Sequence, residues 1–236
     1  MKRFLSIIFT FFIITNLYTQ KKSKKLSIDS LTQKKTKSVG IITSYLDNND
    51  ELYLELSDSI FKKEILVVTR FVQLPSNYSG YINAGSKTSE QVVMFEKKGE
   101  KIFLRQKSFS NIANQIDPIN ISVTKNNLTP ILASFKILNK EKNRYLIDVS
   151  SFFLKDSPGF NIIRKTERDK YKIGRADKNR SSIDSANSYP QNLEIKHTLT
   201  FEASKPPRGN NSKTLSFQIN HSFIELPKNP MPVRYT

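Results

Sequence analysis

Apolar residues fall into short runs from residue 39 to the end of the chain, and turn residues separate these runs. Residues 51–57, ELYLELS, alternate with a period of two, which would place their three leucines on one face of a strand. Residues 63–74, KEILVVTRFVQL, form a more continuous apolar run, which is typical of a central strand. The pattern predicts a mainly β fold, built as an antiparallel sheet or a sandwich of hairpins with a few short helices.

Two stretches predict β-hairpins. Residues 90–109, EQVVMFEKKGEKIFLRQKSF, would turn at Lys98-Gly99 and send four alternating side chains into the core. These side chains are Val93, Phe95, Ile102 and Leu104. Residues 131–153 would form the second hairpin and turn around residues 140–143.

Three stretches predict short helices. Residues 117–128, DPINISVTKNNL, offer Asp117 as an N-cap and Pro118 at the first helical position. Residues 149–156, VSSFFLKD, and residues 180–190, RSSIDSANSYP, could each form a turn or two of helix, the second ending before its proline.

The first 20 residues, MKRFLSIIFTFFIITNLYTQ, have the layout of a secretory signal peptide. Two basic residues precede an apolar run over residues 4–14, which is shorter than the roughly 20 residues that a membrane-spanning helix needs. We therefore expect a signal peptide over residues 1–20, cleaved near Thr19 or Gln20, with an uncleaved anchor as the alternative.

The segment that follows, residues 21–38, is rich in lysine and serine and poor in apolar residues, so we expect a polar, loosely attached linker there. The chain contains no cysteine, which excludes disulfides and a lipid-bearing cysteine. These features predict an exported protein of the periplasm, the cell envelope or the extracellular space. Membrane contact is expected only through the signal segment.

The formal net charge of +17 would attract anionic surfaces. However, lysine and arginine are scattered along the chain and mixed with acidic residues, as in MFEKKGEKIFLRQK. Charges spread in this way usually belong to solvated strand faces and loops rather than to a nucleic-acid site. We therefore expect no nucleic-acid partner.

The chain has only two histidines, and both lie on the apolar side of a predicted strand. His197 alternates with apolar residues in NLEIKHTLTF, and His221 does so in LSFQINHSF. A hairpin centred near Gly209 would place the two histidines directly opposite each other. They could be half of a zinc site, which Glu225 or Asp148 would have to complete, but zinc takes three or four protein ligands. We expect instead two half-buried histidines that hydrogen-bond to their neighbours, with no catalytic, cofactor-binding or metal-binding residues and no cofactor.

The sequence motifs of common hydrolases are absent. Neither histidine belongs to an H-E-x-x-H helix, which a metalloprotease needs to hold zinc and supply a general base. A thiol nucleophile is excluded by the lack of cysteine, and no G-x-S-x-G elbow occurs. The sequence therefore predicts a protein that is not an enzyme.

Several blocks of the chain resemble the N-terminal region of a large family of exported zinc-dependent metalloproteases from bacteria. That region consists of two domains of unknown function, the families numbered 5118 and 5117, and the resemblance runs from about Val39 to Tyr235. The blocks are YLELSDSIFKKEILVVTRF, SEQVVMFEKKGEKIFLRQKSFSNIA, NNLTPILASFKI, LIDVSSFFLKD, DKNRSSIDSANSYPQNLEIKHTLTFEAS and INHSFIELPKNPMPVRY. The resemblance implies a short N-terminal module over residues 39–60 and a β-rich module over residues 61–227.

In that family, a catalytic domain with the zinc-binding H-E-x-x-H helix follows the second module. Residues 228–236 would be the exit linker to that domain, which this chain does not contain. His197 and His221 match positions inside the non-catalytic module and not the family's zinc ligands. The resemblance implies a partner, a metalloprotease catalytic domain encoded downstream.

Two functions are consistent with these features. The first is a non-catalytic scaffold or accessory module of an exported metalloprotease-like protein, truncated or split from its catalytic domain and without peptidase activity of its own. The alternative is a stand-alone envelope protein that binds an anionic glycan, a lipid or a protein partner.

Overall fold

The computed structural model describes residues 26–79, 81–227 and 229. The predicted signal peptide and nearly all of the predicted exit linker lie outside the described residues. The strands are β1 (Thr36–Ser38), β2 (Thr43–Leu46), β3 (Leu52–Ser57), β4 (Ile65–Gln73), β5 (Lys87–Lys98), β6 (Lys101–Lys107), β7 (Ile131–Glu141), β8 (Arg144–Asp148), β9 (Ile173–Ala176), β10 (Ser182–Ser188), β11 (Asn192–Ala203) and β12 (Thr214–Glu225). The helices are α1 (Ile28–Thr32), α2 (Ile119–Asn126), α3 (Ser150–Phe153), α4 (Lys165–Tyr171) and the 3₁₀ turns η1 (Asp58–Lys62) and η2 (Lys178–Arg180).

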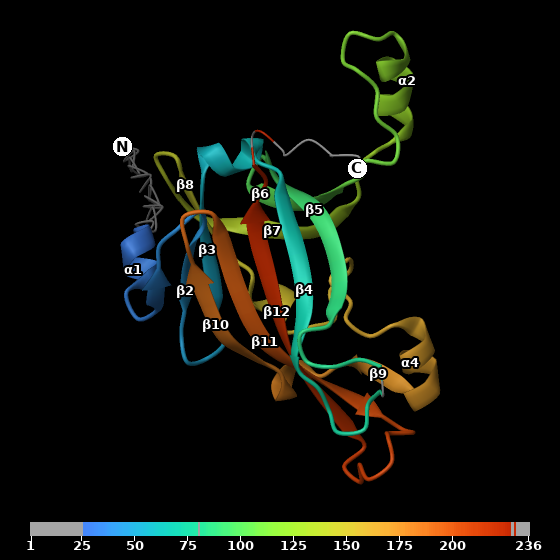
Figure 1. The fold of residues 1–236 in the computed structure, drawn as a ribbon. Coiled ribbons are helices and arrows are strands. Elements are labelled where there is room, and N and C mark those ends of the chain that lie inside the picture. The colour runs from blue at the N-terminus through green and yellow to red at the C-terminus, as the bar shows by residue number, and fades with distance from the viewer. Residues whose placement is uncertain (1–25, 80, 228, 230–236) are drawn as a thin grey trace, which may run out of the picture.

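The strands form one antiparallel sheet, which confirms the predicted mainly β fold with few short helices. The order across the sheet is β1-β2-β3-β8-β7-β6-β5-β4-β12-β11-β10, and β9 pairs with the far end of β11. The sheet curls until its two ends meet, so that β2 lies beside β10 (Figure 1). Ser44 Oγ there donates to the carbonyl of Ala186 at 2.8 Å, and Ser188 Oγ donates to the carbonyl of Ile42 at 2.6 Å. No helix in the described ranges is long and apolar enough to cross a membrane.

The alternating patterns in the sequence become the core as predicted. The leucines of β3 all face inward, and β4 is a central strand between β5 and β12. The two predicted hairpins are present. β5 and β6 turn at Gly99-Glu100, one residue later than the predicted Lys98-Gly99, and β7 and β8 turn at Lys142-Asn143, within the predicted residues 140–143. The four side chains predicted to enter the core from the first hairpin are all buried. The alternation of apolar and polar residues therefore identified the inward face of the strands that pair through short turns.

The two regions of the resemblance share one sheet and one core. β3 pairs with β8 on one side, while β4 lies between β5 and β12. Apolar side chains from both regions, such as Leu54 and Val93, belong to the same buried cluster. A second cluster lies under the far halves of β11 and β12, where β9 and α4 cover them. The strands of residues 39–60 therefore belong to the same sheet and the same core as those of residues 61–227.

Residues 26–38 differ from the loosely attached linker expected there. Ser27 caps α1 by accepting from the main-chain N–H of Ser30, and Ile28 is fully buried against Tyr45 and Leu146. Glu141 accepts a hydrogen bond from the main-chain N–H of Ile28 at 2.7 Å. Contacts with residues far along the chain therefore fold this polar segment onto the sheet.

Residues 182–188 form strand β10 and not the short helix predicted within residues 180–190. The pairing with β11 shifts by one residue between Ile183 and Ser185, which is a β-bulge. The bulge gives the inward side chains a spacing of three and then two residues, so the sequence does not show strand alternation. The other two predicted helices are present, as α2 and α3. The N-cap of α2 is Pro118, one residue later than predicted.

Candidate functional site

The two histidines lie on neighbouring strands and face the interior of the curled sheet. His197 is on β11 and His221 is on β12, and they are 2% and 1% exposed. They are not directly opposite, because His197 pairs with Ile219 and His221 pairs with Ile195. The predicted register was wrong by two residues, since the connecting loop centres one residue earlier than Gly209. A shift of two preserves the face, so the two rings still meet diagonally.

The two imidazole rings are hydrogen-bonded to each other. Nε2 of His197 lies 2.8 Å from Nε2 of His221, and the ring planes are stacked with centroids 4.9 Å apart. Nδ1 of His221 lies 2.8 Å from the hydroxyl of Thr69 on β4, which is fully buried. Phe153 and Phe160 cover the pair, with centroids 5.2–5.7 Å from the imidazoles. The histidines therefore hydrogen-bond to their neighbours as predicted, but they are fully buried and not half-buried.

Each contact of the pair has one donor and one acceptor, and the tautomers of the two rings set which nitrogen donates. Nδ1 of His197 has no hydrogen-bond partner within the described residues. His197 is therefore bonded only through Nε2, and the chain of hydrogen bonds runs from it through His221 to Thr69.

Burial keeps both imidazoles neutral. Burial lowers the pKa of His197 to about 4, against weaker opposing effects of the Phe153 carbonyl and the charge of Asp184. Burial also lowers the pKa of His221 well below its ordinary value, and repulsion from His197 lowers it further. At neutral pH the pair is therefore an uncharged hydrogen-bonded unit inside the core.

The geometry does not fit a zinc site. Zinc holds histidine nitrogens at about 2.0–2.1 Å in a tetrahedral arrangement, which places two such nitrogens about 3.3 Å apart with both lone pairs on the ion. Here the two Nε2 atoms share a proton at 2.8 Å. Across the residues that the structure describes, no group of three or more His, Cys, Asp or Glu side chains could hold a metal ion.

The acidic residues considered as further ligands are used elsewhere. Glu225 lies at the end of β12 and forms an ion pair with Lys63 at 2.7 Å. Asp148 accepts from the main-chain N–H and the hydroxyl of Ser150, at 2.8 and 2.5 Å. Neither contacts the histidines.

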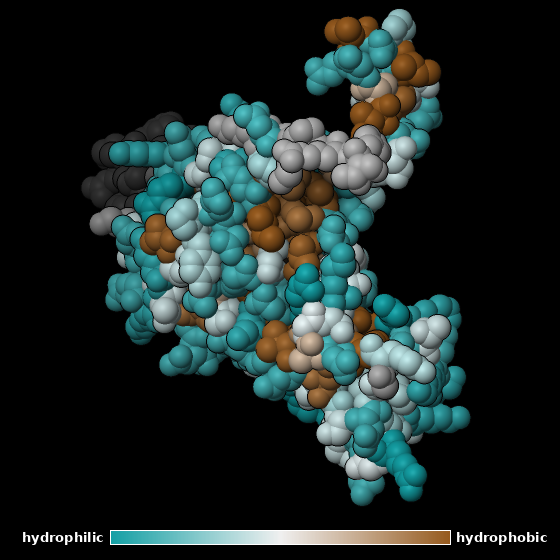
Figure 2. All heavy atoms as spheres, in the orientation of Figure 1, coloured by the Kyte–Doolittle hydropathy of each residue, from teal (hydrophilic) through white to brown (hydrophobic). Residues whose placement is uncertain are grey.

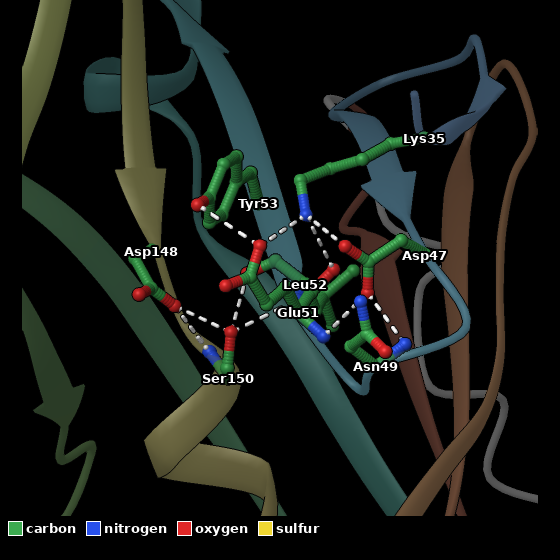
Figure 3. Close-up of polar contacts among 8 residues, drawn as sticks. All are labelled: Lys35, Asp47, Asn49, Glu51, Leu52, Tyr53, Asp148 and Ser150. Atoms are coloured by element: carbon green, nitrogen blue, oxygen red, sulfur yellow. Dashed lines mark hydrogen bonds and ion pairs between the residues drawn. The ribbon is translucent and has the colours of Figure 1, made fainter. Parts of the chain in front are cut away.

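A polar cluster that the sequence did not predict joins the first strands to α3 (Figure 3). Lys35 donates to Asp47 and to Glu51, both at 2.7 Å, and its ammonium lies 4.3 Å from the ring centroid of Tyr53. Asp47 also accepts from the main-chain N–H groups of Asn49 and Glu51, which closes the β2–β3 turn. Burial alone would lower the pKa of Lys35, but the two carboxylates outweigh it and the pKa is raised.

On the other side of the same turn, Ser150 links α3 to β3. Its hydroxyl accepts from the main-chain N–H of Leu52 at 2.9 Å and donates to Asp148. The side chains of this cluster bond to one another and to the main chain of the β2–β3 turn. The cluster holds the β2–β3 turn between the segment that contains Lys35 and helix α3.

A hollow at the far end of β4 is lined by both aromatic and charged side chains. It is lined by Tyr78, Tyr81, Lys87 and Arg164, among others. Tyr78 is buried and its main-chain carbonyl accepts from the hydroxyl of Tyr171, so it is a core residue. Tyr81 is 98% exposed, and Lys87 is paired with Glu90 at 2.6 Å.

The fold defines the chain as a β-sheet module across the described residues. The model of the family described as Domain of unknown function (DUF5117) matches residues 85–236, and the chain belongs to this family. The model of Domain of unknown function (DUF5118) matches residues 25–74. The chain matches no curated protein and no solved structure.

Proposed function

We propose that this chain is a non-catalytic accessory module of an exported zinc metalloprotease-like protein, where it supports a separate catalytic domain. One observation carries the proposal. The only two histidines of a chain without cysteine are bonded to each other inside the core. The chemistry of a zinc peptidase would therefore have to come from another domain.

Two further features support the proposal. The two domains of unknown function match in the same order as in the resembling metalloproteases, and they cover most of the chain. The sheet joins them into one rigid scaffold, as expected for a module that holds a neighbour in place. The link to proteolysis rests on the resemblance alone.

The zinc content of purified protein tests the absence of catalysis. Residues 21–236 would be exposed to zinc, passed through a desalting column and measured by atomic emission, with a casein peptidase assay in parallel. We expect well below one zinc per chain and no cleavage. Stoichiometric zinc together with peptidase activity would overturn the proposal.

The downstream DNA and a binding experiment test the accessory role. A reading frame with H-E-x-x-H after codon 236 would supply the partner, and its purified product should melt at a higher temperature when this chain is added. An unchanged melting temperature would count against a scaffold role.

The alternative is an envelope protein that binds an anionic glycan, and the hollow beside β4 favours it. Tyr81 is almost fully exposed there and could stack on a sugar ring, while Arg164 could pair with an acidic group of the sugar. Tyr81→Ala would then weaken binding to a uronic-acid oligosaccharide in calorimetry. Equal binding by the variant, or no binding by either protein, would exclude this site.

A further inference from the structure

The segment between β6 and β7, residues 108–130, projects from the sheet as an isolated excursion that contains α2 (Figure 1). None of the residues of α2 is buried. Six apolar side chains of the excursion are between 47% and 85% exposed. They are Phe109, Ile112, Ile116, Ile119, Ile121 and Leu128. Figure 2 shows these apolar surfaces gathered on the projecting part, away from the body of the sheet.

The exposed apolar side chains are distributed around the excursion and not along one face. Successive residues of an α-helix are rotated by about 100°, so Ile119 and Ile121 point to nearly opposite sides of α2. Ile112 and Leu128 extend the apolar surface over the two flanking segments. A helix that docks in a protein groove carries its apolar residues on one stripe, whereas exposed apolar side chains on several sides of a projecting segment suit immersion of that segment in an apolar medium.

The net charge of the whole chain selects the kind of apolar medium. Within residues 108–130, Lys125 balances Asp117, and Arg105 and Lys107 at the root of the excursion are ion-paired with glutamates. The charge that complements an anionic surface is therefore the net charge of +17 of the whole chain.

The excursion also satisfies its own main-chain groups. Asn126 donates through its side chain to the carbonyl of Ser122 at 2.9 Å, and Asn127 donates to the carbonyl of Val123 at 2.7 Å. These carbonyls lie in the last turn of α2, where a helix has no main-chain donors for them. Such internal partners lower the cost of moving the helix end out of water.

We propose that the excursion inserts into the interface of an anionic lipid bilayer, with its isoleucines about 5–10 Å below the headgroups. The segment lies in the interface and does not span the bilayer. The proposal is independent of the accessory function, because either the scaffold or a stand-alone binding protein could be held at a membrane in this way.

The absence of tryptophan from the chain allows a site-specific test. Ile116→Trp would report on the excursion, and Tyr81→Trp would report on an equally exposed position at the opposite end of β4. Both variants of residues 21–236, which contain every described element, would be mixed with vesicles of phosphatidylglycerol and phosphatidylcholine. We expect a blue shift and quenching by acyl-brominated lipid for Ile116→Trp, and no change for Tyr81→Trp.

A second variant separates insertion from simple adsorption of a basic protein. Replacement of Ile112, Ile116, Ile119 and Ile121 by serine removes apolar surface that is exposed in the fold, so the circular dichroism spectrum should be retained. Co-sedimentation with the same vesicles should weaken about tenfold or more. Unchanged co-sedimentation would overturn the proposal in favour of electrostatic adsorption. A blue shift of Ile116→Trp that requires no vesicles but rises with protein concentration, or follows addition of another protein, would overturn it in favour of a protein interface.

Discussion

His197 and His221 are held together by one shared proton between Nε2 atoms 2.8 Å apart. This contact joins β11 to β12 on the inner face of the curled sheet, and the chain of hydrogen bonds continues to Thr69 on β4. Three strands are therefore tied together by neutral polar groups that are closed off from water. The arrangement makes the stability of the sheet sensitive to any change that charges or removes an imidazole.

Acid should destabilise the protein in the range where histidines titrate. Both folded pKa values are lowered, to about 4 for His197, whereas an unfolded histidine titrates near 6.5. The unfolded state therefore binds more protons as the pH falls, and stability is present above pH 6.5 and declines toward pH 4. His197 alone should cost about 3 kcal/mol of unfolding free energy by pH 4. Urea denaturation at several pH values would measure this decline, and an unchanged midpoint between pH 6.5 and 5 would contradict it.

Removal of one imidazole should lower the free energy of unfolding strongly. His221→Ala would leave a cavity and would remove the hydrogen-bond partner of both Thr69 and His197, so we expect a loss of about 3–4 kcal/mol. The control is Gln218→Ala on the same strand, whose side chain bonds to Asp184 at the exposed outer face and should cost less than about 1 kcal/mol. Similar losses for the two variants, measured in urea, would show that the histidine pair is not a special point in the core.

The ion pairs of Lys35 should stabilise the fold. Its side chain is only 4% exposed and neutralises Asp47 and Glu51. Lys35→Met would leave these carboxylates without a cation, at a cost of about 2 kcal/mol, because Glu51 remains half exposed to water. Lys34→Met changes an exposed neighbour and should stay within about 0.5 kcal/mol. If thermal unfolding showed no difference between the two variants, residues 26–38 would not be anchored as described.

Closure of the sheet should depend on a glycine. A Cβ atom at Gly40 would lie 2.3 Å from the carbonyl oxygen of Tyr189, where β1 and β2 pass β10. Gly40→Ala should therefore force the two ends of the sheet apart and cost about 2–3 kcal/mol. Gly174→Ala places its Cβ at an ordinary 3.8 Å from its nearest neighbour and should be close to neutral. Hydrogen exchange at the amide of Ile41, which bonds to Tyr189, would report on the closure directly.

The sequence predicted features that depend on neighbouring residues and missed those that depend on distant ones. The β5–β6 hairpin was predictable because two alternating strands flank a short turn with glycine, although the turn lies one residue later than predicted. The ten-residue loop between β11 and β12 gives no such signal, so the histidines were placed on the correct face but in the wrong register. The folding of residues 26–38 could not be predicted, since Ile28 and Lys35 have partners that are remote in sequence or on the far side of a turn. The bulge in β10 interrupts the alternation of its inward side chains, so this strand was predicted as a helix.

The same remote pairings bear on how the protein is made. β4 is complete early in synthesis, but its second neighbour, β12, follows roughly 150 residues later. At about 5–20 residues per second, one edge of β4 waits on the order of ten seconds or more for its partner. During that time an apolar strand edge is open to wrong pairing. A chain of this topology gains from a chaperone that keeps this edge of β4 unpaired until β12 arrives.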